Sequence, residues 1–269
     1  ILEKLIRMTW NSIMSIISSV ALFLPMFMIL IMRLGTYRSF PVLIFYYLLM
    51  LVFNLMDQGY IPASNGFTSY FGYACNFLDI PLMLYFLTYF SPSRTFFNRM
   101  KMVVLAYLAF EVIVIATTGY NAKAVTFVLG PGLVLIMGLA FYFFLRQVKV
   151  LVVHRKATGK ALITSSIIFS YGSFSIVYIL FYILKTHIDS KTGAIRQEYN
   201  DDIHLIYFFS TTLATLIMTA GIFFERKRIQ KLNELKVTRK ELSSIYSETN
   251  SGSKYSTVML DFDHDSWRN

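Results

Sequence analysis

Long, continuously apolar runs separated by short polar connections dominate the chain. A helix that crosses about 30 Å of hydrocarbon needs roughly 20 mostly apolar residues. Runs of this kind predict membrane spans over residues 10–33, 40–60, 70–91, 101–118, 125–146, 161–185 and 203–225. A lone strand would leave its backbone groups unpaired in lipid, and barrel strands alternate apolar and polar residues, which these runs do not. The pattern therefore predicts an all-α fold, a polytopic bundle of seven transmembrane helices.

The composition indicates the same surroundings. Hydrophobic residues make up 56% of the 269 residues, and charged residues only 15%. This leaves too little polar surface to cover a soluble globule. We therefore expect an integral membrane protein, embedded in the lipid bilayer of a plasma or inner membrane.

Basic residues are distributed unevenly over the connections between spans. Cytoplasmic loops of membrane proteins are enriched in Lys and Arg. The connections after the first, third and fifth spans are rich in these residues, whereas those after the second, fourth and sixth contain few. The N-terminus is therefore predicted to lie outside and the C-terminus in the cytoplasm. The basic positions are Arg33, Arg38, Arg94, Arg99, Lys101, Arg146, Lys149, Arg155, Lys156 and Lys160.

The character of the chain changes after the seven-helix transmembrane domain, residues 1–225. Residues 226–249 are basic and are predicted to continue the last span as a cytoplasmic helix. Leu232, Leu235 and Leu242 follow a loose heptad pattern. Two interpretations stay open. These leucines bind a protein partner of the cytoplasm or the membrane, or the helix lies on the membrane with residues 226–240 against anionic lipid head groups.

Residues 250–269 are predicted to form a flexible acidic tail. The alternative is a short docking peptide anchored by Trp267. The basic segment before the tail shows no base-reading or stacking groups, so we expect no nucleic-acid partner.

Polar groups inside the predicted spans are the candidate ligand-binding residues. Asp79 and Glu111 lie near the middle of the third and fourth spans, where an ionisable group is costly to place. Asn76 shares a helix face with Asp79, and Asn54 and Asp57 share one on the second span.

The two mid-depth carboxyl groups, those of Asp79 and Glu111, have no Lys or Arg at the same depth of any predicted span. Three arrangements would accommodate them. They are neutral hydrogen-bonding groups between helices, they face a hydrated cavity, or they hold a cation such as a proton, a metal ion or an organic amine.

Signatures of catalysis are missing from the sequence. It contains no H-x-x-x-H metal pair, no G-x-S-x-G elbow and no phosphate-binding G-x-x-x-x-G-K-[ST] loop. We therefore expect a protein that is not an enzyme, and we predict neither a cofactor nor a metal site.

One stretch of the third span, Tyr73 to Leu82, resembles the third helix of microbial rhodopsins in its Y-A…P-L frame. That family's counter-ion carboxylate would fall on Cys75 and its preceding Arg on Gly72. Residues 203–224 contain no Lys that could form a retinal Schiff base. The resemblance is confined to this stretch and assigns no family.

Three functional hypotheses account for these features. The first is a receptor-like sensor that binds a small ligand or cation near Asp79 and signals through the cytoplasmic helix. The second is a non-catalytic accessory subunit of a larger membrane complex. The third is a proton-coupled transporter that uses Asp79 and Glu111.

Overall fold

The computed structural model describes residues 2–154, 157–180 and 193–249 of the chain. Regular structure in these ranges is helical. The helices are α1 (Leu2–Ile31), α2 (Phe40–Asp57), α3 (Asn65–Leu87), the short 3₁₀ helix η1 (Thr88–Phe90), α4 (Arg94–Thr118), α5 (Ala122–His154), α6 (Thr158–Tyr178) and α7 (Gly193–Thr249).

Seven of the described helices are long and apolar enough to cross a membrane, which confirms the predicted number of spans. Six of the seven helices begin earlier than the predicted spans, and α2 begins at the predicted residue, Phe40. Helix α4 starts at Arg94 because Ser93 caps it, its hydroxyl accepting a hydrogen bond from the Phe96 amide. Basic residues in the first turns of α4 lowered the apolar signal there without ending the helix. Helix α7 begins at Gly193, ahead of the predicted residue 203.

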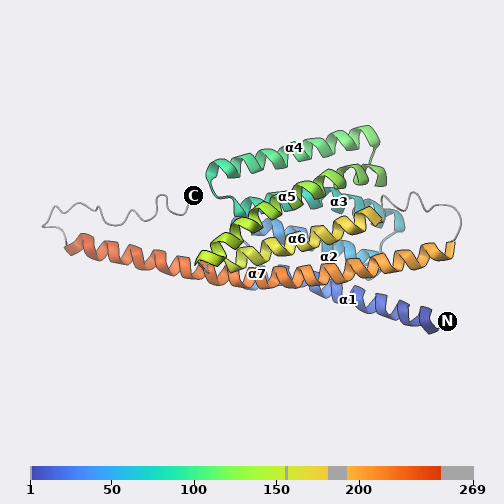
Figure 1. Ribbon diagram of the computed structural model, residues 1–269, viewed down its shortest axis with the longest axis horizontal. Coiled ribbons are helices and arrows are strands. Elements are labelled where there is room, and N and C mark those ends of the chain that lie inside the picture. The colour runs from blue at the N-terminus through green and yellow to red at the C-terminus, as the bar shows by residue number, and fades with distance from the viewer. Residues whose placement is uncertain (1, 155–156, 181–192, 250–269) are drawn as a thin grey trace.

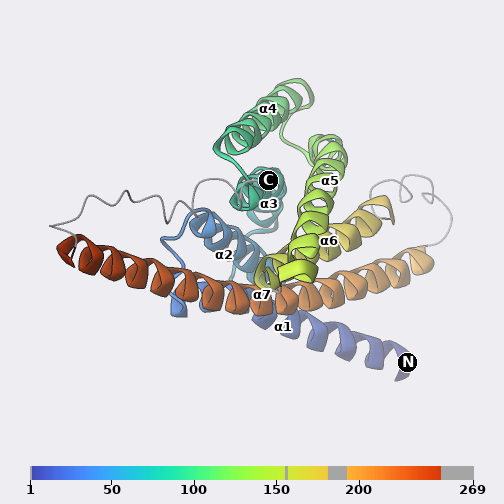
Figure 2. The ribbon, with the colours of Figure 1, turned by 60° about the vertical axis from the view of Figure 1, so that its left-hand side comes forward.

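Six of the helices form a closed ring, and α4 stands outside it. In order of contact the ring is α1, α2, α3, α5, α6 and α7, with α7 returning to pack against α1. Helix α4 packs mainly against α3 and α5, and both views show it at the edge of the bundle (Figures 1 and 2). Helix α3 thus contacts helices on both sides, which puts Asp79 in the interior.

The molecule is apolar both inside and outside. Phe40, Phe86 and Phe143 are fully buried in the core. Large apolar side chains such as Val112 and Val134 are exposed. A surface of this kind suits contact with lipid chains and would favour aggregation in water.

Prolines lie inside three of the helices rather than at their ends. Pro131 of α5 has no N–H to donate to the carbonyl of Phe127, one turn earlier. Tyrosines from neighbouring helices bind the carbonyls on either side. Tyr107 donates to the oxygen of Val128 at 2.8 Å, and Tyr178 donates to that of Thr126 at 2.8 Å. Side chains of adjacent helices thus stabilise the backbone around this break.

Helix α7 is continuous for 57 residues, which corresponds to about 85 Å at 1.5 Å per residue. It passes along the bundle and projects beyond it at its C-terminal end (Figure 1). The predicted boundary at residue 225 is therefore not an interruption of the helix.

Candidate functional site: a polar cavity at Asp79

A cavity of about 110 Å³ lies between α1, α2, α3, α6 and α7. Its lining combines aromatic rings, hydroxyl groups and one carboxyl group. The polar and aromatic lining residues are Tyr46, Tyr47, Phe53, Asn76, Asp79, Ser166, Ser170, Tyr171, Ser173, Phe174, Tyr207, Ser210, Thr211 and Thr215.

The carboxyl group of Asp79 is the central polar feature of the cavity. Asp79 is only 5% exposed. Its Oδ1 accepts a hydrogen bond of 2.6 Å from the Tyr171 hydroxyl on α6, and the Tyr46 hydroxyl on α2 approaches the same group. Asp79 therefore links three helices of the ring through one side chain.

Asn76 stands one turn before Asp79 on the same face of α3. Its amide nitrogen donates to the backbone oxygen of Gly72 at 2.8 Å, which fixes the side chain along its own helix. The neighbouring Cys75 is a buried free thiol that also lines the cavity. Together with Met83, these three residues are the part of α3 that lines the cavity.

The charges and aromatic rings of the lining determine which ligands the cavity can bind. Its lining includes no Lys, Arg or His, so the described residues supply no positive charge to balance an ionised Asp79. Ring faces such as those of Tyr47 and Phe174 can attract a cation, and the hydroxyl groups can donate and accept hydrogen bonds. Since the cavity is smaller than the roughly 300–1,000 Å³ typical of drug-sized ligands, it suits a compact cation or small polar molecule.

Glu111, the other mid-depth carboxyl group, lies outside this cavity. It is 4% exposed on α4, and its Oε1 has no hydrogen-bond partner among the described residues. The Glu111 carboxyl group is close enough to Tyr107 of the same helix to affect it electrostatically, and Asp79 is close enough to affect Glu111. Glu111 is therefore near Asp79 but is not among the residues that line the cavity.

The candidate residues on α2, Asn54 and Asp57, lie outside the cavity. The Asn54 amide nitrogen donates to the Ser19 hydroxyl of α1 at 2.9 Å, and Gln58 donates to the Asn54 oxygen at 2.9 Å. Asp57 is exposed. This cluster joins α1 to α2, and none of its members lines the cavity.

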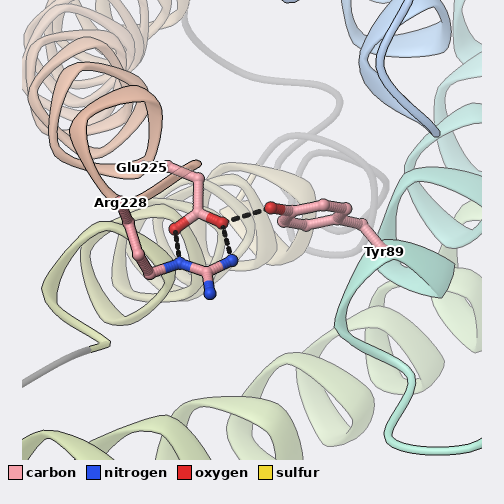
Figure 3. Close-up of polar contacts among 3 residues, drawn as sticks. All are labelled: Tyr89, Glu225 and Arg228. Atoms are coloured by element: carbon pink, nitrogen blue, oxygen red, sulfur yellow. Dashed lines mark hydrogen bonds and ion pairs between the residues drawn. The ribbon is translucent and has the colours of Figure 1, made fainter. Parts of the chain in front are cut away.

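A third buried carboxyl group, which was not predicted from the sequence, lies further along α7. Glu225 is 0% exposed. It accepts hydrogen bonds from the Tyr89 hydroxyl of η1, from Arg228 Nε at 3.0 Å and from Arg228 Nη2 at 2.5 Å (Figure 3). The i, i+3 spacing of Glu225 and Arg228 was a usable sequence signal, whereas the contact with Tyr89 was not.

Close approach of α6 and α7 places Glu225. A Cβ on Gly159 would lie 2.4 Å from the Glu225 nitrogen, and one on Gly221 would lie 2.9 Å from the Ile163 nitrogen. Only glycine allows the two backbones to meet at these points.

Of the predicted partner-binding residues, Leu232, Leu235 and Leu242 are exposed on α7. Trp267 lies outside the described residues. In the described ranges no group of three or more His, Cys, Asp or Glu residues could hold a metal ion.

Comparison with known proteins gives no matching family model, no significantly similar curated protein and no significantly similar solved structure. The class that the seven apolar helices indicate is that of an integral membrane protein. Any finer assignment has to come from the cavity and the helices around it.

Proposed function

We infer that the chain is a receptor-like membrane sensor. In this proposal a small ligand or cation binds beside Asp79 within the helix bundle. Helix α7 then passes a change of position to its extension, residues 226–249, which acts on a partner. No catalytic step is part of the proposal.

One observation carries this proposal: α7, one of the five helices that line the cavity, is also the helix that leaves the bundle. Tyr207, Thr211 and Thr215 of α7 line the cavity, and α7 continues without a break to Thr249. A ligand that displaces this wall would displace the extension too. The signal requires two positions of α7 that differ in ligand affinity, because a ligand with equal affinity for both would shift nothing.

The proposed orientation follows from charge. Connections with many Lys and Arg residues all belong to one end of the antiparallel bundle, the end at which α7 leaves it. The positive-inside rule makes this end cytoplasmic, with the N-terminus outside. The α7 extension would then reach a cytoplasmic partner.

A melting experiment tests the proposal. The purified chain would be heated in mild detergent with Na⁺, K⁺, tetramethylammonium, ethanolamine or a panel of other small amines. A probe present at about 100 times its Kd would stabilise the folded state by about 2.7 kcal/mol. We expect at least one probe to stabilise the wild type and Asp57→Asn, and to have no such effect on Asp79→Asn.

Asp57→Asn is the matched control because it removes an exposed carboxyl group outside the cavity. Equal stabilisation of all three proteins would contradict binding beside Asp79. If no probe stabilises the wild type, the cation form of the proposal fails.

A second candidate is an accessory subunit of a larger complex, favoured by the exposed leucines of α7. Leu232, Leu235 and Leu242 are 42%, 66% and 48% exposed on a helix that leaves the bundle. In this case the chain should co-purify with a stoichiometric partner from its native membrane. Leu235→Lys should release that partner, whereas Lys236→Gln on the same helix should not.

A further inference from the structure

The end of the bundle where α7 leaves it gathers basic side chains from several helices. Lys160 of α6 has Arg38, Arg146 and Arg228 within electrostatic reach. These come from the α1–α2 connection, α5 and α7 respectively. The cluster is thus assembled by the fold from four separate parts of the chain.

Among the described residues, the carboxylate of Glu225 is the one that reaches this cluster, and its oxygens already accept hydrogen bonds. Glu225 receives two hydrogen bonds from Arg228 and one from Tyr89 (Figure 3). The other segments at this end, residues 32–39, 88–101 and 145–165, contain no Asp or Glu. Arg38, Arg146 and Lys160 therefore have no ion-pair partner in the described part of the chain.

Aromatic rings hold two of these cations in place. The Lys160 ammonium lies 5.0 Å from the centroid of the Tyr89 ring, and the Arg38 guanidinium lies 5.7 Å from that of Tyr37. The two tyrosine rings pack edge to face with centroids 6.2 Å apart. Since cation–π contacts restrain long side chains, both charges are positioned before any anion arrives.

The first turn of α6 adds to the positive field. Ala157 stands at its N-cap and supplies no side-chain hydrogen bond. The first amides of a helix point outward without partners within the helix, and the helix dipole is positive at this end. Lys160 lies in this turn, so its charge and the amide dipoles act together on an anion.

We propose that Lys160, Arg146 and Arg38 bind the phosphate group of an anionic phospholipid. A lipid source is favoured because exposed apolar side chains, which can contact acyl chains, lie on the helix of Arg146 and on the helix that precedes Arg38. Leu145 and Val152 of α5 and Ile31 of α1 are 58%, 76% and 55% exposed. The three basic residues of the site lie outside the basic segment 226–240, from which Arg228 reaches the cluster. The site is independent of the cavity at Asp79.

The test compares dioleoylphosphatidylglycerol with dioleoylphosphatidylcholine, each added to the full chain purified in mild detergent. Melting temperature reports stabilisation, and native mass spectrometry reports the number of lipids retained. We expect phosphatidylglycerol to raise the melting temperature of the wild type more than phosphatidylcholine does. Lys160→Gln should bind phosphatidylglycerol about fivefold more weakly, as expected for one basic residue at a membrane surface.

Lys101→Gln is the matched control. Lys101 belongs to α4, and its ammonium lies 4.6 Å from the Phe97 ring centroid, so the same kind of contact and the same charge are removed outside the cluster. Its response to phosphatidylglycerol should equal that of the wild type. Arg146→Gln provides a second cluster variant if Lys160→Gln does not fold, and it should weaken binding to a similar degree.

Two results would overturn the proposal. If the cluster variants and Lys101→Gln respond alike to phosphatidylglycerol, binding does not depend on this cluster. If inorganic phosphate at constant ionic strength stabilises the wild type as strongly, and this effect is lost in Lys160→Gln, the site binds free phosphate and the lipid assignment is wrong.

Discussion

At the scale of single residues, the hydrogen bond from Tyr171 to Asp79 joins α6 to the carboxyl group of the cavity. Its length is 2.6 Å, and both groups are buried. Buried polar groups in a membrane protein are stabilised by such partners, although the measured gain per bond is modest because the unfolded chain also finds partners. The energetic coupling between Tyr171 and Asp79 can therefore be measured by comparing single and double variants.

We predict that Tyr171→Phe lowers the free energy of unfolding by about 1 kcal/mol, because a buried acceptor loses its donor. Tyr171→Phe combined with Asp79→Asn should cost less than the two single changes together. Unfolding in mixed micelles would give the change in unfolding free energy for each of the two single variants and for the double variant.

Tyr178→Phe is the control on the same helix, since Tyr178 donates to a carbonyl of α5 rather than to Asp79. Its effect should add to that of Asp79→Asn, because distant changes are independent. Additive effects for Tyr171→Phe as well would show that the Tyr171–Asp79 bond contributes nothing measurable.

Glu225 provides a second prediction at this scale. Glu225→Gln would leave Arg228 without its carboxylate partner in a site where the arginine side chain is only 28% exposed. Because breaking a buried pair leaves an uncompensated charge, we expect a loss of about 2 kcal/mol in unfolding free energy. Glu234→Gln, an exposed change on the same helix, should have almost no effect. An equal effect of both changes would contradict a structural role for Glu225.

At the scale of helices, the contact between α6 and α7 depends on glycine. We predict that Gly159→Ala costs about 1–3 kcal/mol, since its Cβ would lie 2.4 Å from the backbone nitrogen of Glu225 and backbone cannot move aside as a side chain can. Gly172→Ala is the control on the same helix, because its Cβ would meet only Met137 at 3.6 Å. Thermal melting should separate the two variants, and equal melting temperatures would contradict the close approach.

The helices themselves could be predicted because lipid imposes a simple rule on sequence. A span must be apolar for most of its length, so the runs were visible without any partner helix. Helix ends were less certain, because the first turns of α4, which follow the cap at Ser93, are basic and yet helical. The same ambiguity hid the early start of α7 at Gly193.

The candidate site was predictable only in part. Asp79 and Asn76 were found because carboxyl and amide groups are rare at bilayer depth, and both line the cavity. Tyr46, Tyr171 and Tyr207 were missed because tyrosine is common in membrane helices, and nothing in the sequence tells which ones face inward. Asn54, Asp57 and Glu111 carried the same signal as Asp79, yet the helix packing places them elsewhere.

At the scale of the whole molecule, the two ends of the bundle differ in charge. The connection between α1 and α2 holds Arg33 and Arg38, whereas that between α2 and α3 holds no basic residue. The α7 extension and the basic cluster around Lys160 belong to the first of these ends. The orientation of the molecule therefore decides whether both can act on the cytoplasmic side.

The orientation can be measured with single cysteines introduced into Cys75→Ala, which removes the one native thiol of the sequence. Thr36→Cys and Ala63→Cys would place a thiol at exposed positions at opposite ends of the bundle. We expect a membrane-impermeant maleimide to label position 63 in intact cells and position 36 only after permeabilisation, because positive connections are retained in the cytoplasm. The reverse pattern would place the α7 extension outside the cell. It would then exclude both a cytoplasmic partner for this extension and a cytoplasmic-leaflet lipid at the cluster around Lys160.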